Sequence, residues 1–308
     1  MTESAKTKAL PDIPHEGIVA ALPASWRPYA RLARLDRPIG TWLLLWPCWW
    51  SIALASDGSR PDFALVLLFG LGAVVMRGAG CTFNDIVDRE YDGRVARTAT
   101  RPIPSGEVSL RQAFAFMVVQ ALVGLAILLA LDPLAIQLGV ISLVIVAVYP
   151  FMKRFTHWPQ FVLGLAFNWG ALMGWAAVKG ELDFAPVMLY VGGIFWTFGY
   201  DTIYAHQDKE DDALLGLKST ALRLGDRTRP ALVAFYGGAM VCFVAAGRFA
   251  GLGDEFLLGM AAASAHLVWQ IARLDIDDPA DCLAKFKSNR DFGFILLGAI
   301  LLGQYVKP

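Results

Sequence analysis

The chain of 308 residues is 56% hydrophobic and 18% charged, and its 27 basic residues balance its 27 acidic ones. A soluble domain carries about a quarter charged residues, so this composition favours a membrane protein. The zero net charge argues against a nucleic-acid-binding surface. The four scattered cysteines form no C-x-x-C pair, which argues against a zinc site or a disulfide framework.

The region before the first apolar segment has no h-region or cleavage signature of a secretory signal peptide. We expect a disordered tail over residues 1–25, followed by one membrane-embedded domain over residues 26–308. The stretch WRPYARLARLD, residues 26–36, is basic and amphipathic, and it predicts a helix on the membrane surface. No transit peptide rich in Arg and Ser is visible, which favours a bacterial inner membrane. The alternative is an organellar protein whose transit peptide has been removed.

Apolar segments long enough to cross a bilayer recur along the chain. We predict nine transmembrane helices, at residues 39–56, 63–84, 112–131, 133–151, 159–178, 184–204, 230–247, 254–272 and 291–306. The third and fourth are separated only by LDPL, where Pro133 suits the first turn of a new helix. One helix of about 40 apolar residues is the alternative, but it would exceed the bilayer.

The basic residues orient these helices. With the N-terminus and the loops that carry most of the Lys and Arg side chains on the cytoplasmic side, the chain obeys the positive-inside rule. The predicted fold is therefore an all-α, multi-pass membrane helix bundle.

Acidic residues gather at the cytoplasmic end of the second predicted helix, in NDIVDREYD, residues 84–92. Asn84, Asp88 and Asp92 are four residues apart, so a continuing helix places them on one face. They would lie at a helix C-terminus, where the macrodipole opposes each negative charge by about 0.3–1 kcal/mol. This arrangement predicts a bound cation, and oxygen ligands suit Mg²⁺, which usually shares its coordination with substrate phosphates.

A second acidic cluster follows the sixth predicted helix, in YDTIYAHQDKEDD, residues 200–212. Asp208 and Asp212 repeat the spacing of four, and they too are expected at a helix C-terminus. Basic side chains follow each cluster, namely Arg97, Arg101, Lys218 and Arg223. Acids for a metal and bases for a phosphate, in two corresponding loops, predict a diphosphate bridged by Mg²⁺ between two half-sites. The alternative is that these cytoplasmic loops simply carry mixed charges.

Arg77 is an arginine inside a predicted span, which costs about 2.5–3.5 kcal/mol on insertion scales. It lies seven residues before Asn84 and therefore on the same helix face. Three interpretations remain open: an internal ion pair, a side chain that reaches the interface, or a binding group for an anionic substrate. The last is favoured by the fit of a guanidinium to a carboxylate.

The two acidic motifs read N-D-x-x-D-x-x-x-D and D-x-x-x-D, and both resemble the signature motifs of the UbiA-type intramembrane prenyltransferases. Further stretches narrow the resemblance to the bacterial branch that prenylates 4-hydroxybenzoate in ubiquinone biosynthesis: RLDRPIGTWLLLWPCWW, YPFMKRFTHWPQ and DKEDDALLGLKSTALRLG. The resemblance covers nearly the whole chain from Arg34 onward. It implies about nine helices around a central cavity in the lipid bilayer, with polyprenyl diphosphate and 4-hydroxybenzoate as substrates and Mg²⁺ as cofactor.

The resemblance assigns the metal ligands, and the chemistry of the residues suggests the other roles. One Mg²⁺ would be bound by Asn84, Asp88 and Asp92, and a second by Asp208 and Asp212. The predicted catalytic residues are these four aspartates with Tyr149, whose aromatic face would shelter an allylic cation. The predicted substrate-binding residues are Arg77, Asn84, Arg97, Arg101, Lys153, Arg154 and Lys218. Within that set, Arg77 would hold the carboxylate of the acceptor.

Three neighbouring residues are given weaker roles. Asp85 occupies the second position of the first motif without a clear contact of its own, and Asp201 would support the second motif from behind. His206, beside Asp208, is interpreted as a solvated polar residue rather than a proton acceptor.

Two rival functions remain. A related prenyltransferase would use another acceptor, such as homogentisate, dihydroxynaphthoate, haem or a glyceryl phosphate. A divalent-cation transporter would need acidic groups along a continuous path. The outer halves of the second and sixth helices, FALVLLFGLG and VMLYVGGIFW, are apolar and do not favour such a path.

Overall fold

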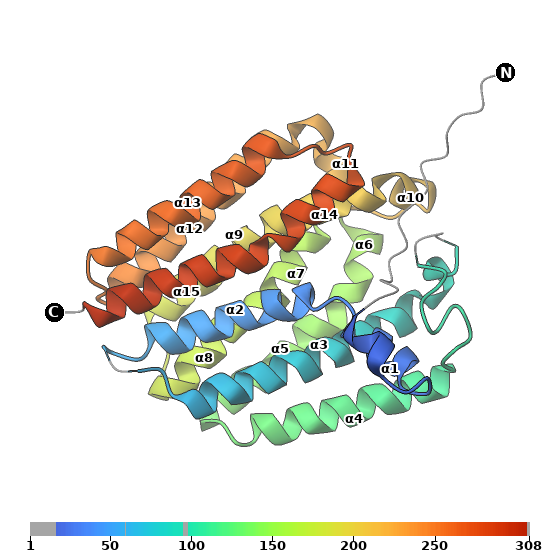
Figure 1. Cartoon of the computed structure of the whole chain (residues 1–308), viewed down its shortest axis with the longest axis horizontal. Helices are drawn as coiled ribbons and strands as arrows, with labels where there is room; N and C mark the ends of the chain where they lie inside the picture. The colour runs from blue at the N-terminus through green and yellow to red at the C-terminus, as the bar shows by residue number, and fades with distance from the viewer. Residues whose placement is uncertain (1–16, 59, 95–97, 307–308) are drawn as a thin grey trace. The chain divides into compact units, whose positions relative to one another are not determined.

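The computed structural model describes residues 17–58, 60–94 and 98–306, and within these ranges it contains helices and no strands (Figure 1). The first half of the chain forms η1 (Ile18–Ala21), α1 (Arg27–Leu32), α2 (Ile39–Leu54), α3 (Phe63–Asp92), α4 (Leu110–Leu128), α5 (Pro133–Val148), η2 (Tyr149–Phe151) and α6 (Met152–Phe155). The second half forms α7 (Pro159–Asn168), α8 (Gly170–Lys179), α9 (Phe184–Ala205), η3 (His206–Asp208), α10 (Lys209–Leu214), α11 (Thr220–Leu224), η4 (Gly225–Arg227), α12 (Thr228–Phe249), α13 (Glu255–Arg273), α14 (Pro279–Lys287) and α15 (Asn289–Tyr305).

The chain divides into two compact units. The first unit consists of residues 1–38 and 75–124, and the second of residues 39–74 and 125–308. The division falls inside α3 and α4, so each of these helices contributes residues to both units.

All nine apolar segments of the sequence are helical, which confirms the all-α prediction. Among the residues that the structure describes, five helical stretches are long and apolar enough to cross a membrane: Phe63–Asp92, Leu110–Leu128, Pro133–Phe155, Pro159–Lys179 and Thr220–Phe249. The helix Ile39–Leu54 is apolar but shorter. The described part of the chain therefore supports a multi-pass membrane protein, while the number nine stays a prediction.

The break predicted at LDPL is confirmed. Asp132 caps α5, because its Oδ1 accepts a hydrogen bond from the backbone N–H of Leu134 at 2.8 Å, and Pro133 is the first helical residue. A second break, at Trp169 between α7 and α8, was not predicted. Asn168 Nδ2 donates to the carbonyl of Gly164 at 2.9 Å. This side chain therefore competes for a carbonyl that a regular helix uses in its own ladder.

The N-terminal region departs from the expected surface helix. Residues 1–16 of the predicted tail lie outside the described residues, and η1 falls in the remainder. The α1 helix ends at Leu32, although the sequence predicted a helix through residue 36. Arg34 follows with a positive φ of 58°, which turns the chain.

The first unit has a small core of its own. Leu32, Val108 and Ala113 are buried together, and Tyr29 of α1 meets Phe116 of α4 edge to face at 5.2 Å. Gly78 of α3 allows a close approach here, because a Cβ at this position would lie 2.1 Å from Gln120 Nε2. These contacts hold α1 against α3 and α4.

The second unit is built around buried aromatic rings. Trp50 of α2 lies 5.2 Å from Trp196 of α9 and 5.7 Å from Phe243 of α12, measured between ring centroids. Both indoles are also anchored by hydrogen bonds to α15: Trp50 Nε1 donates to the carbonyl of Gly293 at 3.0 Å, and Trp196 Nε1 donates to Asn289 Oδ1 at 2.8 Å. Satisfied indole N–H groups let these large rings be fully buried.

The closest packing in this core gives a stability prediction. A Cβ at Gly293 would lie 2.1 Å from Nε1 of the Trp46 ring, which is fully buried. We expect Gly293→Ala to destabilise the protein by about 1–3 kcal/mol through overpacking. The measurement is the melting temperature in detergent. Gly298→Ala is the matched control on the same helix, because nothing lies within 4 Å of its Cβ. Equal melting temperatures for the two variants would contradict the packing described here.

Candidate active site

The first acidic motif lies on α3, which continues to Asp92 as the sequence predicted. Asn84 is half-buried, Asp88 is 1% exposed and Asp92 is 8% exposed. Because these residues are four apart on one continuous helix, their side chains lie on one face. The predicted row of oxygen donors at a helix C-terminus is therefore present in the structure.

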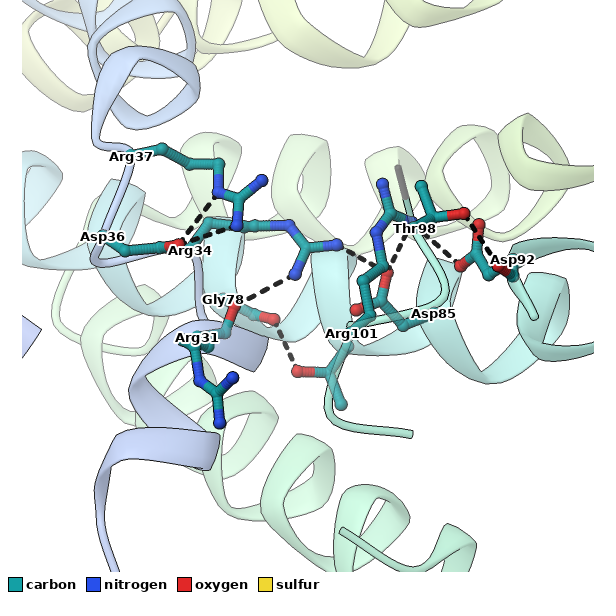
Figure 2. Close-up of polar contacts among 10 residues, drawn as sticks. Arg31, Arg34, Asp36, Arg37, Gly78, Asp85, Asp92, Thr98 and Arg101 are labelled. Carbon is teal, nitrogen blue, oxygen red and sulfur yellow. Dashed lines mark hydrogen bonds and ion pairs between the residues drawn. The ribbon is translucent and has the colours of Figure 1, made fainter. Parts of the chain in front are cut away.

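Asp85, between the first two members of this row, is fully buried and is bound by two arginines (Figure 2). Arg34 Nη2 donates to Asp85 Oδ1 at 2.6 Å, and Arg101 Nη1 donates to the same oxygen at 3.2 Å. Arg101 Nη1 also donates to Asp92 Oδ2 at 2.8 Å. Arg101, a predicted diphosphate ligand, is thus held directly at the first motif. Asp85 serves as the partner of arginines rather than as a fourth member of the row.

The loop after α3 is fixed by a further contact. Thr98 Oγ1 donates to the backbone carbonyl of Asp92 at 2.9 Å, which satisfies one of the last carbonyls of the helix. Arg97, the other basic residue predicted in this loop, lies outside the described residues.

Arg77 is half-buried on α3, two turns before Asn84. Its neighbour Gly78 is in close contact with Gln120 and Ala33, whereas a Cβ at Gly80 would meet nothing within 4 Å. Because α3 is one continuous helix, Arg77 lies on the same face as Asn84, as predicted.

The second motif has a different backbone from the first. The α9 helix ends at Ala205, the turn η3 carries residues 206–208, and α10 begins at Lys209. Asp208 therefore precedes α10, and Asp212 lies in its first turn. The prediction that these acids lie at a helix C-terminus is wrong for this motif, because the 3₁₀ turn ends α9 before they are reached.

Side chains on either side of Asp208 anchor this turn. His206 is 3% exposed, and its Nε2 lies 2.9 Å from Thr228 Oγ1. Lys209 forms an ion pair with Asp277 and donates to the carbonyl of Ile276 at 3.3 Å. The interpretation of His206 as a solvated residue is wrong, since a buried partner hydroxyl lies at its ring.

Three predicted basic residues lie together in the second unit. Lys153 and Arg154 belong to α6, and the Lys218 backbone N–H donates to the carbonyl of Lys153 at 2.9 Å. Lys218 Nζ also donates to the carbonyl of Phe155 at 3.2 Å. Tyr149 is half-buried in the adjoining turn η2. Lys153, Arg154 and Lys218 thus form one basic segment, and Tyr149 lies in the turn just before α6.

Other predicted residues are placed separately. Asp201 is half-buried on α9, whereas Arg223 is exposed on α11. The first motif belongs to the first unit and the second motif to the second unit.

The donors of each motif fit a magnesium ion by their chemistry. Among the described residues, no group of three or more His, Cys, Asp or Glu side chains is arranged to hold a metal alone. Mg²⁺ is usually bound by only one or two carboxylates, together with water and substrate phosphates. The motifs offer oxygen donors only, in Asn84, Asp88 and Asp92 and in Asp208 and Asp212, which suits this hard cation.

Comparison with known proteins gives the family. Residues 44–297 match the UbiA prenyltransferase family. The chain belongs to this family.

Curated UbiA relatives cover most of the chain. A protein of Arabidopsis thaliana is 54% identical over 286 residues, covering 92% of this chain and 70% of that protein. A protein of Homo sapiens is 50% identical over 292 residues, covering 94% and 79%. Both are named "4-hydroxybenzoate polyprenyltransferase, mitochondrial".

Solved UbiA structures share the fold. A UbiA homologue from Aeropyrum pernix K1 superposes with a TM-score of 0.71 at 25% identity, covering 84% of this chain and 96% of that one. A UbiA homologue from Archaeoglobus fulgidus, solved with GPP and Mg²⁺ bound, has a TM-score of 0.63 at 19% identity and covers 89% and 99%. Another structure of that homologue contains Cd²⁺. Solved members of this fold therefore bind divalent metals.

The prediction of a bacterial inner membrane is contradicted by these relatives, whose names place them in mitochondria. That prediction relied on residues near the N-terminus. A transit peptide is removed on import, so a sequence without one does not exclude an organelle. The relatives point to a mitochondrial membrane instead.

The buried His206 gives a prediction about pH. Burial and, to a smaller extent, the nearby Lys209 lower the pKa of His206 from 6.5 to about 4, while Asp277 opposes the shift. The unfolded chain therefore binds a proton first as the pH falls. The neutral, buried His206 therefore contributes its full stabilisation of the folded chain above about pH 6.5, and this stabilisation is lost as the pH falls toward 4.

We expect His206→Gln to reduce the fall in melting temperature between pH 6.5 and pH 4, measured in detergent. His157→Gln is the control, because it removes an exposed imidazole instead of a buried one. An equal loss of melting temperature on acidification in the wild type and in His206→Gln would contradict the assignment.

Proposed function

We propose that this chain transfers a polyprenyl group from polyprenyl diphosphate to 4-hydroxybenzoate, in ubiquinone biosynthesis, with Mg²⁺ as cofactor. One observation carries the proposal: proteins named for this activity are 50–54% identical to the chain over more than nine tenths of its length. The intact motif residues on α3 and around α10 support it, because each has the donors that a magnesium diphosphate requires. The relatives do not support the divalent-cation transporter.

The reaction needs the diphosphate to leave first. The bond between C1 of the prenyl chain and the diphosphate oxygen breaks, and the oxygen keeps the electron pair. Asn84, Asp88 and Asp92 would hold one Mg²⁺, and Asp208 and Asp212 a second. When bound, Mg²⁺ supplies positive charge that stabilises the leaving diphosphate.

The predicted basic side chains would bind the diphosphate oxygens. Arg101 is held at Asp92 by a 2.8 Å hydrogen bond, so its guanidinium lies beside one of the metal donors. Lys153, Arg154 and Lys218 form the basic segment of the second unit, and Arg97 joins the set as a prediction from the sequence. Donors that are already in place stabilise charge as it develops, without reorganising during the reaction.

The acceptor reacts with the allylic cation. The ring carbon ortho to the hydroxyl forms a bond with C1, and the proton on that carbon is then lost. Tyr149 would stabilise the cation with its aromatic face. Arg77 would bind the carboxylate of 4-hydroxybenzoate through two of its N–H groups and so orient the ring. Asp201 would support the second motif.

The metal-binding roles can be tested in a detergent-solubilised assay with Mg²⁺, geranyl diphosphate and 4-hydroxybenzoate. We expect Asp88→Asn and Asp208→Asn each to lower kcat by a factor of about 100 or more, because each removes a charged metal ligand. EDTA should abolish the activity of the wild type. Asp211→Asn is the matched control, since it removes a neighbouring acid outside the D-x-x-x-D spacing. Activity retained in Asp208→Asn would refute its role as a metal ligand.

The acceptor is tested by Arg77→Ala. We expect this change to raise the KM for 4-hydroxybenzoate by about tenfold or more while the KM for geranyl diphosphate stays within a factor of about two, because a charged hydrogen-bonded pair is lost. Homogentisate is offered as a competing acceptor. Preferential prenylation of homogentisate by the wild type would count against 4-hydroxybenzoate as the acceptor. An unchanged KM for 4-hydroxybenzoate in Arg77→Ala would count against the role of Arg77.

A further inference from the structure

Arg34 occupies a position where helix geometry favours glycine. After α1 ends at Leu32, the N–H of Leu35 donates to the carbonyl of Ala30 at 3.0 Å, and the N–H of Arg34 donates to the carbonyl of Arg31 at 3.1 Å. These two bonds form a Schellman motif, whose left-handed residue is usually glycine. Here that residue is Arg34, with φ of 58°. The left-handed conformation is unfavourable for the backbone of an arginine, so an interaction of its side chain must account for the presence of Arg34 here.

The guanidinium of Arg34 points into the first motif. Its Nη1 donates to the carbonyl of Arg31 at 3.0 Å, and its Nη2 donates to Asp85 Oδ1 at 2.6 Å. Arg34 is 8% exposed and Asp85 is fully buried. Figure 2 shows Asp85 between the side chains of Arg34 and Arg101. The left-handed turn therefore places the guanidinium of Arg34 against α3, the helix that carries the first row of oxygen donors.

The two arginines share one oxygen unequally. Arg34 is 2.6 Å from Asp85 Oδ1, whereas Arg101 is 3.2 Å from it and 2.8 Å from Asp92 Oδ2. Coulomb attraction increases as two charges approach, and buried pairs are screened little by salt. The charge of Asp85 is consequently neutralised mainly by Arg34. The shorter contact of Arg101 is the one with Asp92, which belongs to the row of donors.

We propose that Arg34 is a positioning residue for the diphosphate substrate. By neutralising Asp85, it keeps the guanidinium of Arg101 at Asp92, where the diphosphate binds. Without Arg34, the charge of Asp85 would attract Arg101 away from Asp92. This inference rests on the proposed function, which assigns Arg101 to the diphosphate.

The test uses Arg34→Gly in the full chain, because glycine suits φ of 58° and the turn is retained. We expect the KM for geranyl diphosphate to rise about tenfold, while kcat and the KM for 4-hydroxybenzoate change by less than about threefold. Arg34→Lys should recover part of the loss, since it keeps the charge without the planar fork.

Arg31→Ala is the matched control within α1. Arg31 forms an ion pair with Glu107, and no contact joins its side chain to Asp85 or Arg101 among those that the described residues show. This variant should change the KM for geranyl diphosphate by less than about twofold. A rise equal to that of Arg34→Gly would mean that any loosening of α1 raises the KM, and it would overturn the specific role of Arg34.

The double variant Arg34→Gly with Asp85→Asn tests the route through Asp85. Removing the carboxylate removes its attraction for Arg101, so the KM for geranyl diphosphate should return toward the wild-type value. A KM that stays raised would overturn this route. A lower melting temperature for Arg34→Gly with an unchanged KM would reduce Arg34 to a structural residue.

Equilibrium binding of geranyl diphosphate with Mg²⁺ separates this inference from the proposed function. A wild type that binds geranyl diphosphate but prenylates no acceptor would refute the proposed function. The comparison of Arg34→Gly with Arg31→Ala would then be read from Kd. An unchanged Kd in Arg34→Gly would overturn the inference independently of turnover.

Discussion

The first unit depends on keeping three carboxylates buried near the C-terminal end of one helix. Asp85, Asp88 and Asp92 are all at most 8% exposed, within the last eight residues of α3. Carboxylates repel one another, and the negative end of a helix dipole opposes them further. Such an arrangement is stable only when positive charge is supplied from elsewhere. Arg34 arrives from the turn after α1 and Arg101 from the loop after α3, so both segments are paired with this end of the helix.

The second motif differs from the first in its backbone, because it lies on a 3₁₀ turn and a short helix. Neither element is rigid alone, and contacts to distant segments hold them. His206 reaches Thr228 at the start of α12, Lys209 reaches Asp277 before α14, and Lys218 is bonded to α6. These segments are in turn carried by helices that pack around Trp50 and Trp196. The aromatic core thereby fixes the positions of residues that are far from it in sequence.

Periodicity and composition accounted for the helices and for the first row of donors. Asn84, Asp88 and Asp92 were predictable because spacing on one regular helix is a local property. The break at Trp169 and the turn at His206 were not, because each depends on a side chain meeting a particular carbonyl or hydroxyl. Arg34 was missed for a similar reason. Its partner is 51 residues away, and the pairing requires a left-handed arginine that no sequence pattern indicates. The membrane compartment was also predicted incorrectly, since it was inferred from the N-terminal residues, whereas the relatives are named as mitochondrial.

The discontinuity of the first unit bears on how the protein is made. Its two segments, residues 1–38 and 75–124, are separated in the chain by α2 and the beginning of α3, which belong to the second unit. A ribosome therefore completes Arg34 well before Asp85 exists, and Arg101 later still. During that interval α1 has none of its ionic partners, and the nascent chain already includes the apolar α2. The pairing of Asp85 with both arginines must accordingly wait until α3 and the loop beyond it have been synthesised, yet all of these residues precede α5–α15 in the chain.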